Sequence, residues 1–257
     1  MLQELPHRLD RTVIIQAAPK TVFEFFTDTP KWASWWGAGS TIDPQPGGAL
    51  TIRYPDGTEV LGHVVEVRTP ERIVFTYGYA SGKMIAPGGS RVTIALAPIG
   101  DATRLTLTHE FAEAQIRDMH VQGWRYQLSL FANVVTDAQN AGAASLVDAW
   151  FDAWADPDAA ARAATLGRIA SGDLRFKDRY SNTEGLDDLV AHMGAAQHFM
   201  PGIRMTRNGD VRHCQGTVLA EFVAQSADGQ TRASGTSVFV FGANGRIESV
   251  TGFMSAK

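Results

Sequence analysis

The stretch HVQGWRYQLSLFANVVTDAQ, residues 120–139, decides the fold of the first half of the chain. Apolar residues recur along it at the spacing of one helix face: Trp124, Leu128, Phe131, Val135 and Ala138. Such a pattern predicts a long amphipathic α-helix with one continuous apolar stripe. A helix of this length needs a broad apolar surface to pack on, and a sheet formed by the preceding residues can supply it.

The residues before this helix alternate between apolar and polar side chains, which is typical of strands. A short strand is expected at residues 11–16, and two helical segments follow, the first from Pro19 and the second at 31–37. Further strands are expected at 49–54, 59–68, 73–79, 92–96 and 104–108. Pro55-Asp56-Gly57 marks a turn between two of them. This order predicts an α+β domain whose sheet curls around the closing helix and encloses a cavity.

The hydrophobic pattern restarts after residues 140–145, NAGAAS, with a different order of elements. Helices are expected at 146–155, 159–169 and 186–200, with a short strand at 174–178. Antiparallel strands are expected at 204–213, 217–227, 231–241 and 246–253, and Asn244-Gly245 is a strong hairpin signal. Helices followed by a curved sheet predict a second, cone-shaped α+β domain with a pocket. The predicted domains are residues 1–141 and 142–257.

Composition excludes several classes of function. The formal net charge of −4 gives no basic face for nucleic acid. Cys214 is the only cysteine, so no intrachain disulfide can form, and a reducing cytoplasm is expected. The opening residues MLQELPHRLD show no signal peptide, and no run approaches the ~20 apolar residues of a membrane span. We therefore expect a cytoplasmic protein with neither nucleic acid nor membrane as a partner.

Several blocks of the first half carry a family resemblance. They are AAPKTVFEFFTDTPKWASWWG, PGGALTIRYPDGTEVLGHVVEV, PERIVFTYGY, TRLTLTHEF and GWRYQLSLF. Together they resemble the SRPBCC (START-like) superfamily, and within it the branch of the activator of the ninety-kilodalton heat-shock ATPase, over about residues 8–140. The resemblance implies a helix-grip fold with a deep, mostly apolar cavity. A role as a chaperone ATPase regulator ranks last, because the name-giving activators bring a chaperone-binding domain where this chain has a different one.

The second half resembles another family. LVDAWFDAWADPD, LRFKDRYSNTEGLDDLVAHM, VRHCQGTVLAEFVA and FGANGRIESVTGF resemble the SnoaL-like branch of the nuclear-transport-factor-two-like superfamily, over about residues 144–255. That superfamily includes ketosteroid isomerases, polyketide cyclases, epoxide hydrolases and pocket proteins without chemistry, so the fold does not supply the reaction. The isomerases hold an enolate with a tyrosine and a protonated aspartate. Trp150 and Ser237 stand at those places here, which argues against steroid isomerase activity.

Asp178 and His213 are the candidate catalytic residues, both in the second domain. The resemblance places Asp178 where the isomerases carry their catalytic base, and an apolar pocket would raise the pKa of such a carboxylate. The alternative is an aspartate that caps its own loop. His213 shares a strand face with Val211 and could work with Asp178, the alternative being a hydrogen-bonded structural histidine. An enzyme of the cyclase, isomerase or hydrolase kind therefore stays open.

Aromatic side chains and histidines on apolar faces are the candidate ligand contacts. They are Trp35, Trp36, His63, Tyr77, His109 and Trp124 in the first domain and Trp150, Tyr180 and Phe199 in the second. His63 is expected on an apolar strand face with Leu61 and Val65. The alternative for the tryptophans is a place in the hydrophobic core, which is more common for aromatic residues in such numbers. No phosphate-binding loop and no metal-ligand spacing occurs, so neither a metal nor another cofactor is expected.

These observations favour binding of small hydrophobic or aromatic molecules in two apolar pockets, with an enzyme as the alternative. A homodimer is also expected, through the sheet of the second domain. Phe239, Phe241 and Phe253 would otherwise be exposed on that sheet.

Overall fold

The computed structural model describes residues 4–255 and shows the expected α+β fold. The chain separates into two compact units, the first ending at Thr136 and the second beginning at Asp137. Whether segments 1–141 and 142–257 fold independently stays a prediction. Among the described residues, no helix combines the length and the hydrophobicity needed to cross a membrane.

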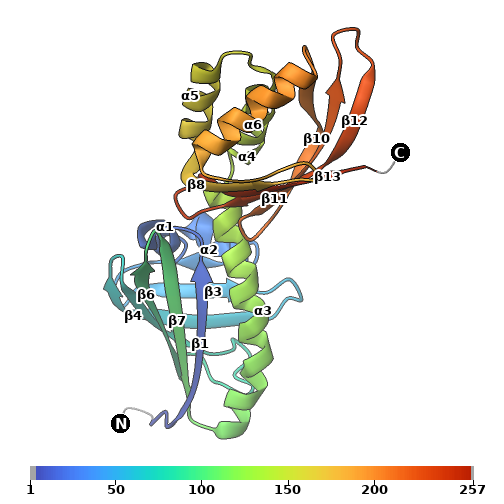
Figure 1. The fold of residues 1–257 in the computed structure, drawn as a ribbon. Coiled ribbons are helices and arrows are strands. Elements are labelled where there is room, and N and C mark those ends of the chain that lie inside the picture. Colours follow the sequence, from blue (N-terminus) through green and yellow to red (C-terminus); the bar gives the residue numbers. More distant parts are fainter. Residues whose placement is uncertain (1–3, 256–257) are drawn as a thin grey trace. The chain divides into compact units, whose positions relative to one another are not determined.

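The first unit is built on a seven-stranded antiparallel sheet with the strand order β1-β7-β6-β5-β4-β3-β2. The strands are β1 (His7–Ile15), β2 (Thr41–Ile42), β3 (Ala49–Arg53), β4 (Glu59–Arg68), β5 (Arg72–Tyr77), β6 (Ser90–Ile99) and β7 (Ala102–Phe111). Its helices are α1 (Pro19–Glu24), α2 (Thr29–Trp36) and α3 (Ala114–Gln139) up to Thr136. Figure 1 shows α3 running along the sheet, as the apolar stripe predicts.

The long helix α3 begins at Ala114 rather than at His120. Four members of its predicted stripe, Trp124, Leu128, Phe131 and Val135, are buried. The fifth member of the stripe, Ala138, was expected to be buried, and this prediction is wrong because Ala138 is exposed. Val135 is the last α3 residue in the hydrophobic core. Phe131 lies at the centre of an aromatic cluster, with its ring centroid 4.7 Å from Trp35 and 4.9 Å from Phe26.

The second unit packs three helices on one face of a six-stranded sheet (Figure 1). The helices are α4 (Ala143–Ala155), α5 (Ala159–Ile169) and α6 (Leu186–Phe199). The strands are β8 (Ala170–Lys177), β9 (Asn182–Glu184), β10 (Arg204–Cys214), β11 (Thr217–Gln225), β12 (Thr231–Phe241) and β13 (Ile247–Met254). The sheet order is β10-β11-β12-β13-β8-β9, with β13 and β8 parallel. The short strand β9 was not expected from the sequence.

Two of the three phenylalanines expected on the outside of this sheet face inwards. Phe239 is 0% and Phe241 1% exposed, because alternate residues of β12 point toward the helices. Only Phe253 remains on the surface, at 57% exposure. The expectation that Phe239 and Phe241 would be exposed is therefore wrong. The homodimer stays a prediction, and of the three phenylalanines only Phe253 offers exposed apolar surface for it.

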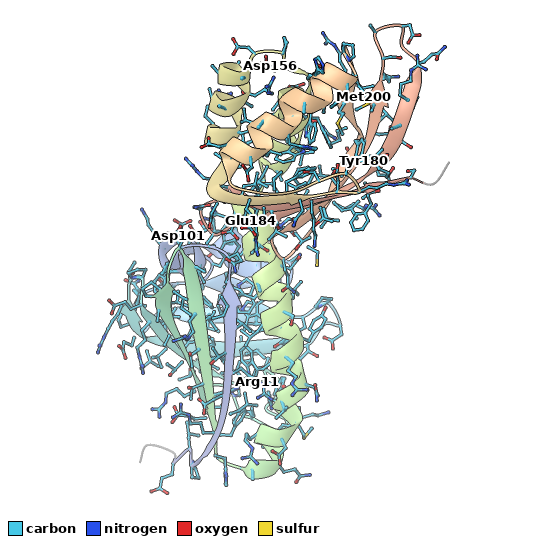
Figure 2. The ribbon with its side chains drawn as sticks, viewed as in Figure 1. Arg11, Asp101, Asp156, Tyr180, Glu184 and Met200 are labelled. Atoms are coloured by element: carbon cyan, nitrogen blue, oxygen red, sulfur yellow. The ribbon has the colours of Figure 1, made fainter. Side chains whose placement is uncertain are left out.

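A buried arginine joins α5 to its neighbours. Arg162 is 4% exposed, and its Nη1 donates to the backbone oxygen of Asp156, 2.7 Å away. Figure 2 labels Asp156 in the connection between α4 and α5. On α6, Gly194 lies against the guanidinium, and a Cβ atom at that position would be 2.8 Å from Arg162 Nη2. The guanidinium therefore fills the space that a side chain at position 194 would need.

Candidate ligand-binding site

The first unit contains a cavity of about 570 Å³ walled by α2, β5, α3 and the loops after β3 and β5. Its lining residues are Trp36, Tyr54, Asp56, Thr58, Tyr77, Tyr79, Ser81, Lys83, Met84, Met119, His120, Gly123, Trp124, Tyr126 and Gln127. Pockets that hold small molecules typically enclose about 300–1,000 Å³ and are mostly apolar with a few convergent polar groups. The walls here are largely aromatic rings, and the polar groups include tyrosine hydroxyls and one imidazole.

Strand β5 with the residues just after it, and helix α3, place Tyr77, Tyr79 and His120 on the cavity wall. Tyr77 ends β5 and Tyr79 follows two residues later, so both point to the same side of the chain. His120 and Trp124 are four residues apart on α3 and therefore share a helix face. The cavity thus lies where the end of β5 faces the first half of α3.

His109 on β7 is fully buried behind the cavity wall, with every polar atom of its ring paired. The indole Nε1 of Trp124 donates to His109 Nδ1 at 2.9 Å. Because an indole can only donate, His109 Nε2 carries the proton and donates to Ser90 Oγ at 2.8 Å. Ser90 Oγ in turn donates to the Tyr77 carbonyl at 2.8 Å. Burial, reinforced by the nearby His120, lowers the pKa of His109 well below its usual value, so the ring is a neutral support for Trp124.

His120 is the imidazole that lines the cavity itself. Its Nδ1 lies 2.8 Å from the carbonyl oxygen of Ile116, and its Nε2 lies 3.1 Å from the hydroxyl of Tyr79. Burial lowers the pKa of His120, and the hydrogen bond to Ile116 opposes this shift.

A second pair of hydroxyls lies in the same wall. The hydroxyls of Tyr54 and Tyr77 are 3.3 Å apart. Burial raises the pKa of Tyr54 to about 12 and that of Tyr77 well above its usual value, so both phenols are neutral. Beside them, the Nε1 of Trp36 is buried and has no hydrogen-bond partner among the described residues.

Four of the residues predicted to bind a ligand are brought together here. Trp36, Tyr77 and Trp124 line the cavity, and His109 supports Trp124 from behind. Trp35 lies deeper in the core, where its Nε1 donates to the Phe25 carbonyl at 3.3 Å. It packs against the wall residue Trp36, with ring centroids 4.0 Å apart.

The other predicted ligand contacts do not line this cavity. His63 is exposed, because Val60, Gly62 and Val64 form the inward face of β4 and the residues between them point outwards. Tyr180, labelled in Figure 2, is 72% exposed, and Phe199 is 81% exposed at the end of α6. Trp150 is core, packed on Phe176 and Phe239 with ring centroids 5.8 Å and 5.9 Å away.

Sequence reasoning missed Tyr54, Tyr79 and His120 as site residues. Two signals for them were present in the sequence. Tyr79 follows Tyr77 at the period of a strand, and His120 precedes Trp124 by one helical turn. Each therefore shares a face with a predicted ligand contact that the structure places on the cavity wall.

Asp178 and His213 each have hydrogen-bond partners within the second unit. Asp178 Oδ1 accepts a hydrogen bond from the Tyr180 amide at 2.8 Å, which is the contact that the loop-cap alternative requires. His213 Nδ1 contacts the Asp137 carboxylate, and its Nε2 accepts from the Gly216 amide at 3.0 Å. No contact within residues 4–255 joins Asp178 to His213. Their catalytic roles stay predictions. Likewise, no three His, Cys, Asp or Glu side chains of the described chain gather in a way that could hold a metal ion.

The substitution Asp178→Ala separates the two interpretations of this carboxylate. As a loop cap, Asp178 stabilises the fold, and its loss is expected to lower the free energy of unfolding by about 0.5–2 kcal/mol. A base kept in an apolar pocket destabilises the fold when ionised, so its removal would raise the melting temperature at neutral pH. Thermal unfolding beside the exposed control Asp152→Ala measures the sign, and a higher melting temperature would contradict the cap.

A comparison with protein families agrees with the resemblance of the first half of the chain. The family model described as "Activator of Hsp90 ATPase homolog 1-like protein" matches residues 16–136. Among solved structures, a putative isomerase of the SnoaL-like family from Agrobacterium tumefaciens str. C58 is 25% identical, covering 46% of this chain and 99% of that chain, with a TM-score of 0.43. A search of curated proteins found no match.

Two further structures are similar at lower identity. CalU16 from Micromonospora echinospora is 21% identical over 50% of this chain and 75% of that chain, with a TM-score of 0.42. The Aha1 dimer from Colwellia psychrerythraea is 16% identical over 48% of this chain and 90% of that chain, with a TM-score of 0.41. By this match and the motifs quoted above, residues 16–136 are similar in sequence to the activator of Hsp90 ATPase homolog 1-like family.

Proposed function

We propose that the first unit binds one small, mostly apolar molecule in the cavity between β5 and α3. The observation that carries this proposal is the cavity itself, with about 570 Å³ of space, aromatic walls and a few polar groups. Apolar surface removed from water stabilises a complex by roughly 25 cal/mol per Å². A flat aromatic or alicyclic molecule would gain most from walls of this kind.

The rigidity of the walls also supports binding. Trp124 is held by His109, whose ring is fixed in turn by Ser90 and the Tyr77 carbonyl. On the other side, Trp36 packs on Tyr54 and Trp124 with ring centroids 5.7 Å and 5.8 Å apart. Side chains that are already ordered lose little conformational entropy when a ligand arrives, so less of the binding energy is spent on ordering them.

The second unit gives less support for a second binding pocket. The ring of Trp150 packs directly against Phe176 and Phe239, which fill the space between α4 and the sheet. Enzymatic activity based on Asp178, and a chaperone-related role suggested by the name of the matched family, stay predictions. No contact described above favours either of them over binding in the first unit.

Gly123→Leu is designed to fill the cavity without disturbing the fold. Gly123 lies on the cavity wall in α3, and a Cβ atom there meets no other atom within 4 Å. A leucine is therefore accommodated by the backbone, and it also raises helix propensity by about 0.5–1 kcal/mol. We expect the variant to keep or increase its melting temperature and to lose ligand affinity by about tenfold or more.

Native mass spectrometry of freshly purified protein, looking for a co-purified small molecule, identifies the ligand. Titration of that molecule into the Gly123→Leu protein then measures the loss of affinity. Gly167→Leu on α5 is the matched control, because Gly167 is a helical glycine with equally open surroundings in the second unit. Equal binding by both variants would contradict the proposed site.

A further inference from the structure

The hydrogen bonds of His120 fix the direction of its bond with Tyr79. The carbonyl of Ile116 can only accept, so the Nδ1 atom 2.8 Å away carries a proton. In the neutral ring Nε2 then has no proton and accepts the hydroxyl proton of Tyr79 across 3.1 Å. The single proton of Tyr79 is thereby used, and its oxygen has only lone pairs left to offer.

Both residues line the cavity, so this direction decides what a ligand meets there. A ligand group that reaches the Tyr79 oxygen must bring its own proton. When His120 is protonated, Nε2 becomes a donor to the Tyr79 oxygen, and the hydroxyl proton is free to turn toward the ligand. The same tyrosine then donates to a carbonyl or an ether.

We propose that the Tyr79–His120 pair selects ligands that donate a hydrogen bond, such as phenols and alcohols, over ligands that only accept one, and that protonation of His120 reverses this selection. The inference rests on the proposed function, because it concerns the ligand bound in the same cavity. It adds a chemical class of ligand to that proposal.

The groups around His120 leave it as the residue that titrates in this wall. From β5 and the loop after it come the phenols of Tyr77 and Tyr79, whose ring centroids both lie 6.1 Å from the imidazole. From β7 comes His109, 5.5 Å away, which Trp124 holds in its neutral form. The charged side chains on the cavity lining are Asp56 and Lys83, both exposed. Because burial lowers the pKa of His120, its neutral ring predominates at neutral pH, and this is the form that favours ligands that donate a hydrogen bond.

Two naphthalene probes of similar shape test the inference by calorimetric titration. 2-Naphthol donates a hydrogen bond, whereas 2-acetonaphthone only accepts one, and both stay uncharged between about pH 5 and pH 8. At about pH 8 we expect 2-naphthol to bind about fivefold more tightly than 2-acetonaphthone, the equivalent of one neutral hydrogen bond. The ratio of the two affinities should fall as the pH drops through the pKa of His120.

Two variants assign the effect to Tyr79. Tyr79→Phe should bring the affinity ratio close to one and make it independent of pH. Tyr180→Phe removes a hydroxyl from an exposed tyrosine outside this cavity and should leave both the ratio and its pH dependence unchanged. An unchanged ratio in Tyr79→Phe, or a wild-type ratio that does not vary with pH, would overturn the inference while binding itself stands. Failure of both probes to bind would overturn the proposed function together with it.

Discussion

Phe131→Ala is expected to lower the free energy of unfolding of the first unit by about 3–5 kcal/mol. Phe131 is fully buried in α3, and its ring contacts Trp35, Phe26 and Phe25, with centroids 4.7 Å, 4.9 Å and 6.0 Å away. Removing the ring loses the transfer free energy of a phenyl group and leaves a cavity that the surrounding large rings cannot close.

Urea unfolding followed by tryptophan fluorescence measures this loss. Tyr126→Ala is the control, because Tyr126 is an aromatic residue on the same helix but is 70% exposed. The control should change the free energy of unfolding by less than about 0.5 kcal/mol. If the two variants were equally stable, Phe131 would not be part of the core described here.

Acidification is the second large effect, and it comes from the buried His109. Burial lowers the pKa of His109 well below its ordinary value of 6.5. Above that value the ring is neutral in both the folded and the unfolded chain, and its protonation does not affect stability. Below it the unfolded chain binds a proton that the folded chain does not bind. Stability is therefore lost as the pH falls, by about 1.4 kcal/mol for each pH unit, until the folded pKa is reached. The lowered pKa of His120 acts in the same direction.

Unfolding free energies measured between about pH 6.5 and pH 4.5 give this slope. His109→Leu removes the titrating group, so its slope should be shallower than that of the wild type. It should also cost about 1–3 kcal/mol at neutral pH, because Trp124 Nε1 loses its acceptor and Ser90 its donor. His63→Gln, at an exposed histidine on β4, should leave the slope unchanged. A wild-type slope in His109→Leu would show that His109 is not the source.

Much of the fold was predictable because periodicity reports directly on burial. The helix from Ala159 to Ile169 and the strand from Thr231 to Phe241 have the bounds that the sequence predicts. The inward face of β4 was not predictable, since this strand has apolar residues on both sides. Val60 and Val64 are buried, while Val65 is 50% exposed. A period of two shows that the faces alternate, but it does not identify which one packs on the core.

The candidate site was predictable only as separate aromatic residues. Trp36, Tyr77 and Trp124 stand out by residue type, and the structure places them on the cavity wall. The bond between Tyr79 and His120 depends on how the chain after β5 meets the first turns of α3, and residues 41 positions apart carry no local signal of such a contact. For Asp178, the family resemblance indicated a catalytic role. The structure shows a hydrogen bond from the backbone amide of Tyr180, two residues away in the sequence.

The close fit between Arg162 and Gly194 also constrains how this sequence can change over time. A methyl group added at position 194 would meet the guanidinium, so a larger residue there requires a shorter or displaced side chain at position 162. Conversely, a shorter residue at position 162 would leave an empty space beside Gly194 of α6, and the Asp156 carbonyl would lose its hydrogen-bond donor. Substitutions at these two sites are therefore expected to arise as compensating pairs, so related sequences should show them co-varying.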